Sequence, residues 1–206
     1  MWFRRFRKFS LHSKHPKPSK PFPMLEPNFS PFPEIQTARL LLRRIIKTDA
    51  PEILSMRSDD NVMQYIDREK AKTIEDAEAW IQMVNDVVDN NNGINWAISL
   101  LDQPQTQIGT IGFWRIIKQH YRAEVGYMLA PAYWRKGITK EALLAVIDHG
   151  FNNMQLHSIE AHINPGNAAS AALLENTGFV REAYFKEDFY FRGSFIDTAI
   201  YSLLIK

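Results

Sequence analysis

The stretch EVGYMLAPAYWRKGIT, residues 124–139, decides the fold of this chain. A strand ends at Pro131, a turn follows, and a long helix begins near Gly137. The start of a helix offers unpaired N–H groups and the positive end of its dipole, so it attracts anions. Arg135 and Lys136 add charge, and Gly137 allows a phosphate to approach closely. The segment predicts phosphate binding, although Gly137 could also serve only to start the helix; neither a P-loop nor a GxGxxG fingerprint is present.

Elements of both kinds flank this segment and set the fold class. Strand patterns before and between helical patterns predict a mixed α/β (α+β) sheet with helices on its faces, in the order β-α-α-β-β-β-α-β-α-β-β. The final two strands form a hairpin around Arg192 and Gly193. Strands are expected at residues 39–46, 96–101, 107–117, 122–129, 158–163, 180–191 and 195–205, and helices near residue 49 and at 73–88, 137–152 and 168–176.

Composition indicates an ordinary soluble globular protein. Its 206 residues, 45% of them hydrophobic and 23% charged, suffice for one sizeable core. The absence of cysteine excludes disulfides and thiolate metal sites and fits a cytoplasmic setting. No apolar run is long enough to span a bilayer. The six histidines lack metal-ligand spacing, so no metal is expected.

The charge is unevenly distributed. Residues 1–33 contain seven Lys/Arg, one Glu and seven prolines, whereas residues 34–206 contain 18 basic and 22 acidic residues, a balance of −4. The proline density predicts an extended, largely disordered basic arm before a single domain at residues 34–206. The acidic domain suits a cationic acceptor better than nucleic acid, for which only the arm is a candidate.

A second motif, NPGNAASAALLENTGF at residues 164–179, follows the first by about 30 residues. Together, YMLAPAYWRKGITKEAL and this motif closely resemble the two acetyl-CoA motifs of the GNAT acetyltransferases. The segments TARLLLRR, QIGTIGF and FYFRGSFIDTAIYSLL are similar to the ribosomal-protein alanine/serine N-terminal acetyltransferase branch. The resemblance covers residues 34–206 and implies a GNAT-like, mostly antiparallel sheet.

The resemblance also implies a site for acetyl-CoA as co-substrate. The main chain of Met128 and Leu129 and the side chain of Asn167 would bind the pantetheine arm. Arg135 stands where this branch often has Gly, and Thr139 where Gly or Ala is usual. The amides expected to hold the pyrophosphate belong to Arg135, Lys136, Gly137, Ile138, Thr139 and Lys140.

The chemistry needs few side chains, because acetyl-CoA is already an activated thioester. A neutral amine must be held against its carbonyl, a proton accepted and the leaving thiolate protonated. Glu124 is the candidate general base, or else a structural ion-pair partner. Ser170 is a candidate acid, or else a helix cap. Many relatives place a tyrosine acid where this chain has Leu174, so Tyr133 or Tyr190 could substitute, and His162 is expected to be structural.

The leading hypothesis is transfer of acetyl from acetyl-CoA to a primary amine, with a protein N-terminal α-amine of the ribosomal-protein type first. The alternatives are small amines such as polyamines, a non-catalytic acyl-CoA-binding module, and an RNA-associated protein that works through its arm. The acceptor pocket is expected between residues 59–73 and 184–196. Either a monomer or a homodimer fits the sequence.

Overall fold

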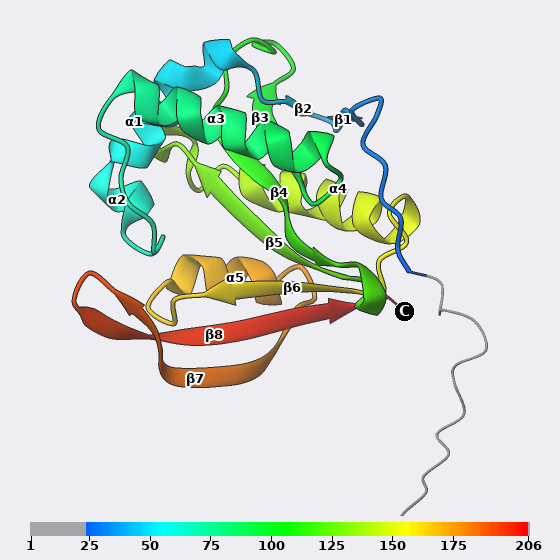
Figure 1. The fold of residues 1–206 in the computed structure, drawn as a ribbon, viewed down its shortest axis with the longest axis vertical. Coiled ribbons are helices and arrows are strands. Elements are labelled where there is room, and N and C mark those ends of the chain that lie inside the picture. Colours follow the sequence, from blue (N-terminus) through cyan, green and yellow to red (C-terminus); the bar gives the residue numbers. More distant parts are fainter. Residues whose placement is uncertain (1–23, 206) are drawn as a thin grey trace, which may run out of the picture.

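Eight strands pair into one mixed sheet in the computed structural model, which describes residues 24–205 (Figure 1). Their order across the sheet is β1-β2-β3-β4-β5-β6-β8-β7. Every neighbouring pair is antiparallel except β5 and β6. The strands are β1 (Ile35–Gln36), β2 (Leu40–Arg44), β3 (Ile94–Leu100), β4 (Gly109–Ile117), β5 (Arg122–Leu129), β6 (Ser158–Ile163), β7 (Val180–Phe191) and β8 (Ser194–Leu204). The predicted mostly antiparallel mixed sheet is confirmed.

The helices cover the two faces of this sheet. They are α1 (Ala50–Ser58), α2 (Asp60–Met63), α3 (Ile74–Asp89), α4 (Ile138–Asn152) and α5 (Ala168–Glu175). Ile53 of α1 and Ile81 of α3 share a buried cluster with Met128 on one face. Leu143 of α4 and Leu174 of α5 join the larger cluster on the other. Within residues 24–205, none of the helices combines the length and apolar character that a membrane crossing requires.

Local signals in the sequence explain where these elements begin and end. The Thr73 hydroxyl accepts from the Asp76 N–H, and the Asp76 carboxylate accepts from the Thr73 N–H, so the two residues cap α3. The β7–β8 turn has positive φ angles at Arg192 (47°) and Gly193 (85°), as two-residue hairpin turns require. The predicted order of elements is confirmed, with the short β1, α2 and three 3-10 turns added.

Residues 24–33 correct one expectation. They contain no helix or strand, as predicted, but they are not a disordered arm. Leu25 and Phe29 are buried in the α4-side core, and the Leu25 N–H donates to the Lys118 carbonyl at 3.1 Å. The Trp96 indole donates to the Pro33 carbonyl at 2.7 Å. The ordered body therefore includes Met24 onwards rather than starting at residue 34; the remainder of the predicted arm, residues 1–23, lies outside the described residues.

The feature that positions the site is the separation of β5 and β6. These two strands pair only through residues 122–124 and 158–160, at one end of each strand. Beyond Glu124 and Glu160 the strands diverge, as Figure 1 shows. The rest of β5 therefore has no strand partner on this side, and we call the region between the diverging strands the gap. The gap lies between the α1–α3 half of the fold and the β6–β8–β7 half.

Candidate functional site

The β5 side of the gap offers free peptide groups. The Ala130 N–H donates to the Ile108 carbonyl at 2.9 Å, so Ala130 faces β4. The N–H and C=O groups of successive residues in a strand point to opposite sides. Those of Met128 therefore point to its β4 partner Thr110, and those of Tyr127 and Leu129 point into the gap. Met128 was expected to bind pantetheine through its main chain, but its main-chain groups point to β4, whereas those of Tyr127 do not. The Leu129 carbonyl already accepts from the Trp134 indole at 2.7 Å, which leaves the Leu129 N–H.

The loop after β5 ends in an uncapped helix start. Gly137, the residue before α4, makes no side-chain cap, and its φ of 74° together with 59° at Arg135 curls the loop. The first backbone bond of the helix runs from the Glu141 N–H to the Gly137 carbonyl at 3.1 Å. The N–H groups of residues 138–140 therefore have no intrahelical partner, and such a curled, donor-rich helix start is an anion site. This geometry supports the phosphate-binding interpretation.

A network from the start of β2 holds this loop in place. Thr37 Oγ1 donates to Glu141 Oε1 at 2.6 Å, Arg39 Nε donates to Glu141 Oε2 at 2.7 Å, and Arg39 Nη1 donates to the Lys136 carbonyl at 3.0 Å. Partial burial alone would raise the pKa of Glu141, but the hydrogen bonds from Thr37 and Arg39 outweigh it and lower that pKa. Glu141 thus stays ionised and Arg39 balances its charge. The sequence gives no local signal for this contact, because the two residues are far apart in the chain.

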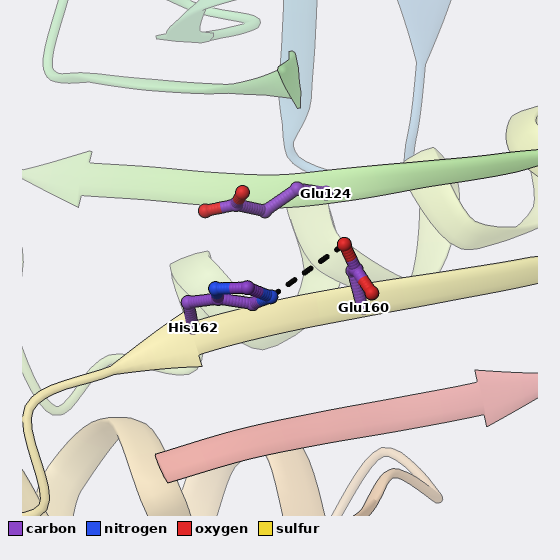
Figure 2. A group of neighbouring side chains, drawn as sticks. All are labelled: Glu124, Glu160 and His162. Carbon is purple, nitrogen blue, oxygen red and sulfur yellow. Dashed lines mark ion pairs between the residues drawn. The ribbon is translucent and has the colours of Figure 1, made fainter. Parts of the chain in front are cut away.

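Three titratable side chains meet at the apex of the gap. Glu124 projects from β5, and Glu160 and His162 project from β6 into the space between the strands (Figure 2). One ligand-type atom from each residue lies within 4.8 Å of the others. The sequence interpretation placed Glu124 here but missed the other two. Glu160 and His162 are two apart in β6 and so share one face of the strand. Two polar residues on one face of a strand inside the sheet were the signal that could have indicated a site.

Two arginines balance these carboxylates. Arg115 Nε lies 3.1 Å from Glu124 Oε2, and Arg122 Nε lies 3.3 Å from Glu160 Oε2. Arg115 reaches Glu124 from a bulge in β4, where the register shifts between Trp114 and Ile117. Bulges of this kind redirect side chains and are common beside active sites.

A second polar pair lies on the face of β5 opposite to Glu124. The Tyr127 hydroxyl and Ser170 Oγ are 2.6 Å apart, and burial raises the pKa of Tyr127 to about 12 despite the hydrogen bond with Ser170. Both hydroxyls therefore stay protonated at neutral pH. The Asn167 side chain accepts from the Ser170 N–H at 3.0 Å and so caps α5. Tyr133 lies apart from this pair, with the Lys136 ammonium over its ring.

The gap is bordered by the segment after α2 and by the β7–β8 hairpin. Arg192 at the hairpin turn donates to Glu69 Oε2 at 2.9 Å, which joins the two segments. The Tyr65 ring lies against Gly166, just beyond β6, where an added Cβ would come within 3.2 Å of the ring. The two segments expected to form the acceptor pocket, residues 59–73 and 184–196, are thus in contact with each other.

Comparison with known proteins decides the family. The model of the acetyltransferase (GNAT) domain matches residues 39–180. The chain belongs to the GNAT acetyltransferase family. It is 36% identical to YoaA, an uncharacterised N-acetyltransferase of Bacillus subtilis, over 84% of this chain and 97% of the relative. A GNAT-family acetyltransferase structure from Bacillus anthracis superposes with a TM-score of 0.73 at 29% identity, covering 83% of this chain and 98% of that one.

GNAT relatives with named substrates fall into two classes. The spermidine N(1)-acetyltransferase of Vibrio cholerae is 25% identical over 78% of this chain and 90% of its own length. The ribosomal protein uS5-alanine N-acetyltransferase of Escherichia coli is 27% identical over 61% of this chain and 65% of its own. The protein is therefore an acetyl-CoA-dependent N-acetyltransferase of GNAT type. Its relatives act on amines of both classes, so the acceptor has to be argued from the site.

Proposed function

We propose that this protein acetylates the N-terminal α-amine of a protein, of the ribosomal-protein type. The observation that carries the proposal is the charge balance around the gap. Four carboxylates on its borders already pair with a cation each, so these four are not free to bind the several ammonium groups of a polyamine. The pairs are Asp60–Lys70, Glu69–Arg192, Glu124–Arg115 and Glu160–Arg122.

A polyamine makes a different demand. It carries several ammonium groups along one flexible chain, and each one needs a carboxylate that is not neutralised by the protein itself. A peptide N-terminus presents a single ammonium and then a neutral backbone, which an exposed hairpin surface can support. Tyr190 and Phe195 offer such a surface near the hairpin turn, with ring centroids 5.0 Å apart. The charge pattern therefore favours the α-amine.

The proposed reaction is direct transfer in a ternary complex. Acetyl-CoA would bind with its pyrophosphate on the α4 start and its pantetheine arm in the gap. Glu124 accepts the proton of the acceptor ammonium, and the neutral amine attacks the thioester carbonyl carbon. In this proposal the Tyr127 N–H stabilises the oxyanion, and the Ser170–Tyr127 pair protonates the leaving thiolate.

Calorimetric titration with acetyl-CoA, followed by competition between acceptors, tests this proposal. Gly137→Trp is the control, because a side chain at φ 74° is strained and would block the loop. The fold should persist, because a Cβ added at Gly137 meets only Arg39 Nη2, at 3.6 Å, and no core residue. We expect micromolar binding that the control loses.

The acceptor competition offers alanine- or serine-starting peptides together with spermidine, and mass spectrometry locates the acetyl group. We expect the α-amine to be preferred by at least tenfold in kcat/KM. A preference for spermidine would refute the acceptor assignment and leave the enzyme class intact. Tight acetyl-CoA binding without transfer to any amine would indicate a non-catalytic binding module instead.

A further inference from the structure

We propose that His162 is a second proton acceptor of the reaction, relaying the acceptor's proton from Glu124, and that Glu160 positions its imidazole. The proposal rests on the proposed function and deepens it. Neither Glu160 nor His162 was expected in the site, yet both lie at the apex of the gap beside Glu124 (Figure 2). The argument combines their placement, their missing hydrogen bonds and the charges around them.

Strand alternation fixes the placement of the three residues. Glu160 and His162 are two apart in β6 and share one face, while the alternating residues Ile159 and Ala161 are buried in the α4-side core. Glu124 pairs with Glu160 across the last paired position of β5 and β6. His162 is therefore the first outward residue of β6 beyond the paired region. It borders the opening through which the acceptor amine reaches the thioester.

The hydrogen bonds of this cluster are incomplete. Glu124 Oε2 and His162 Nε2 are both buried and, although each has an ion-pair neighbour, neither has a hydrogen-bond partner within residues 24–205. His162 Nε2 approaches Glu160 Oε1 at 3.5 Å, an ion-pair distance rather than a good hydrogen bond. Buried polar atoms without such partners are costly and rare in native proteins, so they mark a site that is completed by another group. An ammonium or one water between Glu124 and His162 would complete this one.

The Glu160 carboxylate lies 3.5 Å from His162 Nε2, where it can balance the positive charge of the imidazolium that the relay forms. The charged groups that face the ring are Glu160 on its own strand, Glu124 on β5, and the arginines that pair with the two carboxylates, Arg115 from β4 and Arg122 from β5. β8, the other neighbour of β6, places Ile200 opposite His162. The cluster is thus neutral before the proton arrives.

A relay has a thermodynamic reason. An ordinary imidazole binds a proton about two pKa units more strongly than an ordinary carboxylate, which makes it about 100-fold better as the final acceptor from an ammonium. The ammonium N–H bond breaks, and its proton passes through Glu124, or a bridging water, to the His162 imidazole. The freed nitrogen lone pair forms the C–N bond, the C–S bond breaks, and the electron pair leaves on the CoA sulfur. The attacking nitrogen then loses a second proton, which replaces the one that the Ser170–Tyr127 pair gives to the thiolate. The imidazolium then returns its proton to solvent.

The same three residues have the spacing of a metal site, and the charges argue against that use. Arg115 and Arg122 already neutralise the two carboxylates, so a divalent cation would enter a site with no net negative charge and two guanidinium groups beside it. The proton relay needs no added cation and leaves both arginine–carboxylate pairs in place. Activity measured with and without EDTA separates the two possibilities.

The test is the pH profile of kcat/KM for wild type, His162→Gln and Glu160→Gln, with His157→Gln as the matched control. His157 is exposed and lies directly before β6, outside the cluster. We expect His162→Gln to lower kcat 10- to 100-fold with an unchanged acetyl-CoA dissociation constant, and to change the shape of the pH profile. Free imidazole should restore part of the activity of His162→Ala. Glu160→Gln should lower kcat about tenfold and keep the shape of the wild-type profile.

Each other outcome has a defined meaning. An unchanged profile and a kcat within twofold in His162→Gln, beside normal wild-type transfer, would refute the relay alone. Loss of wild-type activity in EDTA with recovery on adding zinc would replace the relay by a metal site. Wild-type protein that binds acetyl-CoA and acetylates no amine at any pH would refute the proposed function and the relay with it. Thermal melting of each variant separates these results from unfolding.

Discussion

Arg39→Ala is expected to weaken acetyl-CoA binding by about 5- to 30-fold while the fold persists. The change removes the hydrogen bond that fixes the Lys136 carbonyl and the cation that balances Glu141. The anchoring bond is worth about 1 kcal/mol, discounted because the Arg39 side chain is 50% exposed. An unbalanced carboxylate at the helix start costs a bound anion about 0.3–1 kcal/mol. Together these make about 1–2 kcal/mol, at tenfold per 1.4 kcal/mol.

Glu141→Gln is the matched control, and it separates charge from anchoring. The amide oxygen can still accept from Thr37 Oγ1 and from the Arg39 main-chain N–H, while the bond from Arg39 Nε and the negative charge beside the pyrophosphate are gone. We expect binding within about twofold of wild type. In the double variant, removal of the carboxylate should recover the electrostatic part of the Arg39→Ala loss, and raising the salt concentration should shrink that part further.

Calorimetry on the four proteins at two salt concentrations gives the required cycle. If Glu141→Gln weakens binding as strongly as Arg39→Ala, and the double variant is no better than either, then the network acts only by holding the loop and the charge argument is wrong. If Arg39→Ala binds acetyl-CoA as wild type does, the loop conformation does not depend on this network at all.

Two further predictions concern the other polar pairs. Tyr127→Phe should lower kcat by about 10- to 100-fold at unchanged acetyl-CoA affinity. Because burial raises the pKa of Tyr127 to about 12, the stability that its protonated hydroxyl contributes is complete below the ordinary tyrosine pKa of about 10 and is lost as pH rises towards 12. A difference in phenolate absorbance between wild type and variant that rises near pH 10 would contradict the burial of Tyr127. Asp49→Ala should lower the free energy of unfolding by about 3–5 kcal/mol in urea, because it leaves the buried Arg43 guanidinium without the carboxylate that lies 2.7 Å from it. A loss below about 1 kcal/mol would show that the fold does not need this ion pair.

Features encoded locally were predictable from the sequence. Gly137 before a helical pattern predicted both the helix start and its exposed amides, and the structure places it at φ 74°. The Arg192–Gly193 turn followed from the same kind of signal. Residues 24–33 show the limit of such reasoning. Proline density correctly excluded regular structure there, but it said nothing of Leu25 and Phe29, each of which finds a place in the core.

Contacts that depend on register and bulges could not be read from the sequence. The Arg115–Glu124 pair exists because β4 shifts register between Trp114 and Ile117, a backbone irregularity with no residue signature here. The meeting of Glu160 and Glu124 depends on which parallel register β5 and β6 adopt. Because a slip of one residue would exchange the faces of a strand, a correct list of strands still leaves such neighbours undetermined.

The odd spacing of Glu124 and Tyr127 has a chemical consequence of its own. Three residues apart on one strand, their side chains emerge on opposite faces, so the carboxylate lies with Glu160 and His162 and the phenol lies with Ser170. Acetyl transfer needs a proton accepted from the amine and a proton given to the sulfur. If the two groups shared a face, the proton donor could bond directly to the carboxylate and neither would be free. In the proposed mechanism, the strand between them keeps the proton acceptor and the proton donor separate, and the end of β5–β6 pairing at Glu124 would give the thioester access to both.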